Sequence, residues 1–103
     1  MNGGYTKSML AYVIRQPDKI CSIPTSAKAV AFTFRPSIET ILETLERAKR
    51  INVIMISDGY TKSMGTGTKR LLKLHNIELR NTPEQLQGRH NIDNVIEFEE
   101  SKE

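Results

Sequence analysis

Residues 29–56 read AVAFTFRPSIETILETLERAKRINVIMI, and this stretch decides the fold. Its two ends, 29–34 and 51–56, are apolar nearly throughout, as in parallel strands that are covered on both faces. Between them, Pro36 and Ser37 offer a helix start, and apolar residues then recur at helical spacing. These apolar residues are Ile38, Ile41, Leu42, Leu45 and Ala48. The stretch therefore predicts a strand–helix–strand unit whose helix buries one face.

The same alternation of strands and helical segments continues on both sides of this unit. Runs of apolar and β-branched residues predict five strands, the last at the edge of the sheet. They cover residues 10–15, 29–34, 51–56, 77–80 and 94–98. Pro17 begins a short helical turn after the first strand. Residues 57–68 form a predicted glycine-bearing loop that leads into a helix ending at His75, with Asn76 as its C-terminal cap. We expect His75 on or near the inner face of that helix, where it either faces the core or caps the helix end.

Strand–helix–strand repeats with short links imply parallel strands and right-handed crossovers. The predicted fold is therefore α/β, with repeated strand–helix units and a small, mainly parallel sheet. We expect helices on both faces of this sheet. An alternative is a short α/β solenoid that resembles leucine-rich repeats, with all helices on one side, although the repeat signature itself is absent.

Length and charge fit one ordinary domain. The chain has 103 residues, 26% of them charged, and a net charge of +3. Without the Glu-rich end from Glu97 to Glu103 the net charge rises from +3 to +6, because four Glu and one Lys are removed. We predict an N-terminal extension at 1–8, a single α/β domain at 9–98 and a frayed acidic tail at 99–103.

Cysteine and membrane signals are sparse in this sequence. Cys21 is the sole cysteine, so there is no intrachain disulfide and no cysteine-based zinc site. We expect it to be a small buried hydrophobe, and the alternative is a reactive thiol. No stretch reaches the ~20 apolar residues that cross a membrane, and the first eight residues lack the apolar core of a signal peptide. These features predict a cytoplasmic protein that needs neither a metal nor a cofactor.

The hexapeptide GYTKSM occurs twice, at Gly4–Met9 and at Gly59–Met64. The residues that flank the two copies differ, so they do not mark a duplicated domain. One explanation is a copied N-terminal leader without a function of its own. The other is that residues 1–8 imitate the internal segment and compete for its docking place.

Polar residues gather where three predicted strands end. In parallel α/β sheets the loops after the carboxyl ends of the strands share one edge, and ligands bind there. These loops hold basic side chains, hydroxyl groups and two helix N-termini, which together suit an anion such as phosphate. The candidate binding residues are Arg35, Ser37, Ser57, Tyr60, Lys62, Ser63, Lys69, Arg70, Arg89 and His90. Taken singly, Ser37 and Thr66 or Thr68 can be explained as helix caps, and the bases as a solvated rim.

Specific catalytic motifs are absent. The segment around Lys62 differs from a phosphate-binding loop of nucleotide triphosphatases, since Thr61 stands where that motif has glycine. No G-x-S-x-G accompanies Ser57, and the two carboxylates near the edge, Asp58 and Asp93, belong to distant loops. His90 alone makes no metal site. The sequence favours a non-enzymatic protein and names no catalytic residues.

Three motifs in these loops resemble an uncharacterised archaeal family, known mainly from methanogens and carrying only an unknown-function label. The resemblance runs from Met9 to about Phe98. It rests on Phe34-Arg35-Pro36-Ser37, on Tyr60-Thr61-Lys62-Ser63, and on Gly88-Arg89-His90 followed by Ile92-Asp93. The last motif transposes the Arg and His of the family's pattern. Members of the family often continue into a helical tail that resembles a DNA-binding helix-turn-helix. The resemblance implies an archaeal origin and an unassigned activity, and it places residues 1–8 outside the shared domain.

The function that these features favour is binding of a polyanion, DNA or RNA, in a regulatory role. Contact with backbone phosphates would dominate, so affinity would fall steeply with salt, and sequence selectivity would require a homodimer. One alternative is an enzyme or sensor for a small phosphorylated metabolite, with Arg35 and Lys62 holding the anion. The other is a protein-interaction domain with an incidental charged rim.

Overall fold

The described part of the chain forms a sheet of five strands, and four of them follow one another in chain order across it. The computed structural model describes residues 5–82 and 95–102. The sheet order is β4-β3-β2-β1-β5; neighbours among β1 to β4 run parallel, and β5 pairs antiparallel with β1. The strands are β1 (Tyr5–Ile14), β2 (Ala29–Phe32), β3 (Val53–Ile56), β4 (Glu78–Asn81) and β5 (Val95–Lys102). The predicted small α/β sheet, mainly parallel, is confirmed.

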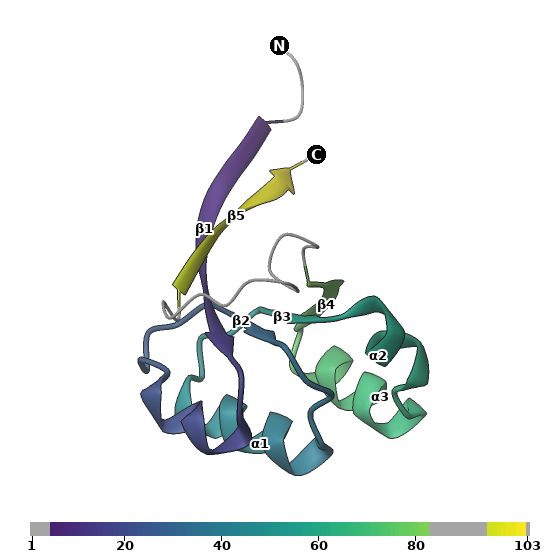
Figure 1. Cartoon of the computed structure of the whole chain (residues 1–103). Coiled ribbons are helices and arrows are strands. Elements are labelled where there is room, and N and C mark those ends of the chain that lie inside the picture. The colour runs from purple at the N-terminus through teal and green to yellow at the C-terminus, as the bar shows by residue number, and fades with distance from the viewer. Residues whose placement is uncertain (1–4, 83–94, 103) are drawn as a thin grey trace.

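Helices connect the parallel strands, and they gather on one side of the sheet (Figure 1). They are the short 3-10 helix η1 (Pro17–Ser22), and the α-helices α1 (Ile38–Arg47), α2 (Asp58–Ser63) and α3 (Thr66–Leu74). Because each new parallel strand is added on the same side of the previous one, right-handed crossovers must place every connection on the same face. The expectation of helices on both faces was therefore wrong. The one-sided arrangement is the one that the solenoid alternative predicts.

Both faces of the central strands are apolar, as the sequence predicts. Alternate residues such as Val30 and Ile54 face the helices and join the larger core, with Ile41 and Leu72 from α1 and α3. The residues between them form a second buried cluster of small and medium side chains. Its members are Ala11, Val13, Ala29, Ala31, Val53 and Met55. Among the residues that the structure describes, no helix lies on this second face.

The inner face of α1 is rotated from the prediction. Thr40, Ile41 and Thr44 are buried, whereas Ile38 and Leu42 are 44% and 46% exposed. The Thr44 hydroxyl donates to the Thr40 carbonyl at 2.7 Å, so its burial leaves no unpaired polar atom. The buried side of α1 therefore combines Ile41 with two threonines, while Ile38 and Leu42 lie largely outside it.

The ends of the helices follow the local chemistry. Ser37 is the N-cap of α1, and its hydroxyl oxygen accepts from the Thr40 N–H at 3.1 Å, as predicted. Asn76, with φ 57°, ends α3: its N–H donates to the Lys73 carbonyl and the Ile77 N–H donates to the Leu72 carbonyl. This pair of bonds is a Schellman motif. The predicted Asn76 cap is confirmed.

Three local predictions were wrong. Residues 58–63, predicted as loop, form α2, and Gly65 rather than Thr66 or Thr68 occupies the N-cap of α3. Cys21 is exposed. In the three-residue turns of η1, Ile20 and the following Ile23 share the buried side, so Cys21 lies about 120° away from it.

The two copies of GYTKSM adopt different structures. Tyr5–Met9 of the first copy belongs to β1 and pairs with β5, whereas Gly59–Ser63 of the second belongs to α2. β1 thus includes part of the predicted extension at 1–8, and β5 continues to Lys102 through part of the predicted tail. The domain boundaries stay predictions.

Candidate functional site

The loops after β2 and β3 meet at the carboxyl edge of the sheet. The Arg35 guanidinium donates to the backbone carbonyl of Ser63 at 3.1 Å, across 28 positions of sequence. Since Ser63 is the last residue of α2, this bond connects the start of α1 to the turn that precedes α3. Two of the three predicted loops are therefore brought together. The third, with Arg89 and His90, lies outside the described residues.

A cavity of about 550 Å³ lies between the N-termini of α1 and α3. Its lining comes from the loop after β2 and from the turn between α2 and α3. The lining residues are Arg35, Pro36, Ser37, Ile38, Met64, Gly65, Gly67 and Thr68. The N-terminus of a helix carries a partial positive charge and N–H groups without intrahelical partners. One cavity thus borders two helix N-termini and an exposed guanidinium.

The glycines at this cavity are not required by packing. A Cβ atom built at Gly65 or Gly67 would meet no atom within 4 Å, and neither glycine has a positive φ. Their lack of side chains instead leaves the start of α3 open to approach. Glycine at such a position lets a ligand come close to the backbone N–H groups.

The hydroxyl of Ser37 is already used within the protein. It caps α1 and lies 3.0 Å from the Thr40 hydroxyl. Ser37 lines the cavity, but its oxygen is committed to the helix end, as the capping explanation proposed. The cationic contribution to the cavity therefore comes from Arg35.

Ser57 and Tyr60 line a different, smaller cavity of about 210 Å³ at the ends of β2 and β3. Phe32, Thr33 and Thr82 complete its lining. Thr82 is held there by its N–H, which donates to the Ile56 carbonyl at 2.9 Å. The predicted binding residues are thus divided between two cavities, and sequence reasoning missed Thr33 and Thr82. Both follow parallel strands directly, which is the signal that could have identified them.

Lys62, Ser63, Lys69 and Arg70 are exposed and line neither of these two cavities. Lys69 and Arg70 lie on α3, and Lys73 is exposed on the same helix. The sequence of α3, TGTKRLLKL, contains no acidic residue. Cations near a helix N-terminus and like charges three or four residues apart are both unfavourable to the helix. This basic α3 surface is therefore not explained by helix stability.

Arg15 is a basic residue of this edge that the candidate set omitted. It directly follows β1, and its Nε atom is buried without a hydrogen-bond partner among the described residues. The candidate residues were chosen because they follow the carboxyl ends of predicted strands. The first predicted strand ends at Arg15, so the same criterion should have included this residue. A buried guanidinium nitrogen without a partner is energetically costly.

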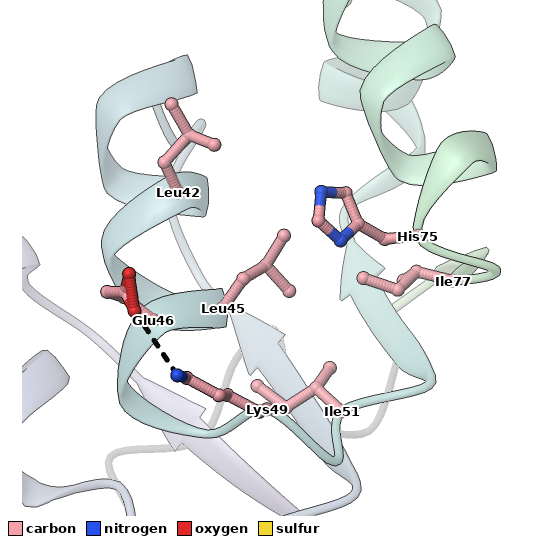
Figure 2. Close-up of a pocket in the computed structure, with 7 residues that line it drawn as sticks. All are labelled: Leu42, Leu45, Glu46, Lys49, Ile51, His75 and Ile77. Carbon is pink, nitrogen blue, oxygen red and sulfur yellow. Dashed lines mark ion pairs between the residues drawn. The ribbon is translucent and has the colours of Figure 1, made fainter.

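A third cavity, of about 370 Å³, lies between α1 and the end of α3 (Figure 2). Its side chains are mainly aliphatic, with an ion pair between Lys49 and Glu46 at 3.8 Å and with His75 opposite Leu45. His75 is exposed and is the C-cap residue of α3, so the prediction that it faces the core was wrong, and the alternative, that it caps the helix end, is confirmed. Residues that precede β3 and β4, Ile51 and Ile77, also line it. This cavity lies away from the carboxyl edge.

Two further kinds of feature are absent from residues 5–82 and 95–102. No group of three or more His, Cys, Asp or Glu side chains there could hold a metal ion. In the same part of the chain, no helix has both the length and the apolar character that crossing a bilayer requires.

Comparison with known proteins identifies a family for most of this chain. The model of a family of unknown function (DUF1699), N-terminal domain, matches residues 11–94. No curated protein and no solved structure matches the chain. The matched range includes the strands, helices and loops that form the carboxyl edge, and it agrees with the resemblance inferred from the loop motifs. The chain belongs to this DUF1699 family of unknown function, and the part of it that matches corresponds to the family's N-terminal domain.

Proposed function

We propose that the protein binds nucleic acid through the carboxyl edge of its sheet and the basic surface of α3. The observation that carries this proposal is the bond from Arg35 to the Ser63 carbonyl. It connects the start of α1 with the turn before α3, beside a helix that carries three exposed bases and no acid. Phosphate groups along a polymer could contact the helix N-termini and the bases of α3 together.

The charge distribution supports a polymeric ligand over a single small anion. Lys69, Arg70 and Lys73 do not line the cavity between α1 and α3, so a ligand confined to that cavity would not use them. Non-specific contact with phosphates requires only such exposed cations. Tyr60 is 39% exposed and is the one aromatic among the candidate residues, so we expect little base stacking.

A salt titration tests this function. Fluorescence anisotropy with labelled single-stranded DNA, duplex DNA and RNA at about 50 and 200 mM salt should show affinity falling ~100-fold, for roughly four phosphate contacts. The variant with both Lys69→Gln and Arg70→Gln should bind more weakly and lose about two units of the salt slope. Lys28→Gln with Arg50→Gln is the matched control, because these exposed bases precede strands at the opposite edge. Equal loss in both double variants would refute the assignment to α3.

A small phosphorylated metabolite is the second candidate ligand. The observation in its favour is the cavity itself, whose volume of about 550 Å³ lies in the range of small-molecule sites. Titration with inorganic phosphate and with nucleoside monophosphates distinguishes the two. Saturable amide shifts confined to residues 35–37 and 64–68, with no binding of polymer, would select the metabolite.

A further inference from the structure

The outer surface of α1 is acidic. Three exposed glutamates lie on it, all within about 40° of the direction opposite the buried Ile41. They are Glu39, Glu43 and Glu46. The single base of α1, Arg47, is directed to the end of η1, where its Nε–H donates to the Ile23 carbonyl at 2.6 Å. The exposed charge of α1 is therefore negative, and Glu43 has no ion pair with any described residue.

The outer surface of α3 has the opposite charge. Arg70 and Leu74 lie within about 20° of the direction opposite the buried Leu72, with Lys73 beside them. The helix contains three bases and no acid, and helix stability does not explain this composition. Arg70, like Glu43, forms no ion pair among the residues that the structure describes. The layer of helices thus presents an acidic ridge on α1 beside a basic ridge on α3.

The two ridges run in the same direction and lie at the same level. The starts of both helices border the cavity of about 550 Å³, and their ends border the cavity of about 370 Å³. Figure 2 shows Leu45 of α1 and His75 at the end of α3 facing each other across the second cavity. Glu43 is the sixth residue of α1 and Arg70 is the fifth of α3, so their positions along the helices differ by only about 1.5 Å.

Symmetry converts these matching levels into matching contacts. A twofold axis that runs parallel to both helices, over the gap between them, places α1 of each copy on α3 of the other. Rotation leaves the position along the axis unchanged, so Glu43 meets Arg70 of a second copy, and Glu46 meets its Lys73. A twofold axis across the helices would instead place α1 on α1 and α3 on α3, where like charges repel. Charge therefore selects the first arrangement.

The centre of this arrangement is apolar. Ile38 and Leu42 are 44% and 46% exposed, and each lines one of the two cavities in the gap between α1 and α3. An axis over that gap brings these side chains of the two copies together and leaves the charged ridges at the rim. Leu74 is 76% exposed and would also be covered. An apolar centre with a polar rim is typical of protein interfaces, whereas nucleic acid would be repelled by the glutamates of α1.

We propose that two copies of this chain form a homodimer through their helix layers, with the twofold axis parallel to α1 and α3. The charges select the orientation, and the aliphatic side chains supply the apolar contact. Because exposed ion pairs contribute little, we expect a weak dimer with a dissociation constant on the order of 100 μM. The proposal does not depend on nucleic-acid binding. It implies that the glutamates of α1 occupy the place of phosphates on α3, so a second copy and nucleic acid exclude each other there.

Two charge reversals test the contact between Glu43 and Arg70 in the full chain. Glu43→Lys places two bases together at both symmetric contacts, and Arg70→Glu places two acids together. Each variant alone should raise the dissociation constant at least about tenfold. Lys28→Glu is the matched control, because this exposed base precedes β2 at the opposite edge of the sheet, and it should leave the dimer unchanged. Sedimentation equilibrium without nucleic acid, at up to ~1 mM protein, measures all four proteins and is independent of the salt titration.

An equimolar mixture of the two variants identifies which helices meet. In a mixed dimer, α1 of the Glu43→Lys copy meets α3 of the Arg70→Glu copy, and the other contact keeps its wild-type residues. Both contacts then join opposite charges, so the mixture should dimerise as the wild type does. Each chain carries one change only, and an interaction within one chain cannot produce this recovery.

Three outcomes overturn the proposal. The first is a wild type that stays monomeric at ~1 mM. The second is a mixture in which the two variants do not associate. The third is a Glu43→Lys variant that pairs with the wild type more tightly than the wild type pairs with itself, because that result would place α1 on α1.

Discussion

Arg35 donates a hydrogen bond of 3.1 Å to the carbonyl of Ser63, and the same side chain lines a cavity of about 550 Å³ at this edge of the sheet. The bond connects the loop after β2 to the end of α2, and thereby fixes the start of α3 relative to α1. The residue is exposed, so the bond contributes modestly to stability. Its larger effect is geometric, since it keeps two helix N-termini at the same cavity.

Arg35→Lys and Arg35→Gln should separate these two roles. Lysine keeps the charge but lacks the planar fork that can bond a carbonyl and an anion together. We expect Arg35→Lys to retain the salt slope of nucleic-acid binding, and Arg35→Gln to reduce it by about one unit. Anisotropy titrations over a series of salt concentrations measure both slopes, with Lys28→Gln as the control. If Arg35→Gln left slope and affinity unchanged, phosphate contact by this residue would be excluded.

Lys69→Gln with Arg70→Gln should raise stability while it lowers affinity. Lys69 lies at the end of the first turn of α3, where a cation opposes the helix dipole, and Lys69 and Arg70 are four and three residues from Lys73, which repels both. Neutralising them should increase the free energy of unfolding by a few tenths of a kcal/mol for each residue. Urea denaturation followed by circular dichroism measures the change. A loss of stability would show that the two side chains support the fold.

Two neighbouring residues of α1 should respond very differently to truncation. Ile41 is fully buried, so Ile41→Ala should cost about 2–5 kcal/mol of unfolding free energy. Leu42 is 46% exposed, and Leu42→Ala should cost less than about 1.5 kcal/mol. The same denaturation experiment compares them. Equal costs would contradict the rotated inner face of the helix.

Replacing Asn76 with glycine should change the stability of the protein little, whereas replacing it with alanine should lower the stability. Its φ of 57° lies in the left-handed region, which costs a residue with a Cβ atom about 1 kcal/mol unless its side chain compensates. Asn76→Gly should therefore stay within a few tenths of a kcal/mol of the wild type, whereas Asn76→Ala should lose about 1 kcal/mol. Thermal melts of the two variants provide the comparison. A more stable alanine variant would argue against the Schellman end of α3.

Local sequence features predicted most of the elements. The apolar runs at 29–34 and 51–56 contain β2 and β3, and Pro36-Ser37 marks the start of α1. Short-range chemistry suffices here, because a cap or an apolar run acts over a few residues. The prediction from local features failed at residues 58–63, whose glycine and hydroxyl residues suggested a loop. In the structure, Tyr60 and Thr61 donate their N–H groups to the Ser57 carbonyl and form the first turn of α2.

The candidate site was predictable in part. The rule that ligands bind at the carboxyl ends of parallel strands selected Arg35 and the segment from Ser57 to Arg70, and the structure brings Arg35 to Ser63. Which residues share a cavity was not predictable, because that depends on the angles at which α1, α2 and α3 leave the sheet. Ser57 and Tyr60 consequently line a different cavity from Arg35.

The sequence by itself determined the approximate positions of the strands and of α1, and the edge of the sheet at which the polar loops gather. Tertiary structure alone decided that β1 to β4 add in chain order, which puts the helices of the described residues on one face of the sheet (Figure 1). It also decided that TKS is strand at residues 6–8 and helix at 61–63. The physical reason is that local preferences of a few tenths of a kcal/mol per residue are overridden by a long-range partner. β5 supplies the pairing for the first copy, and α2 forms where β3 ends for the second.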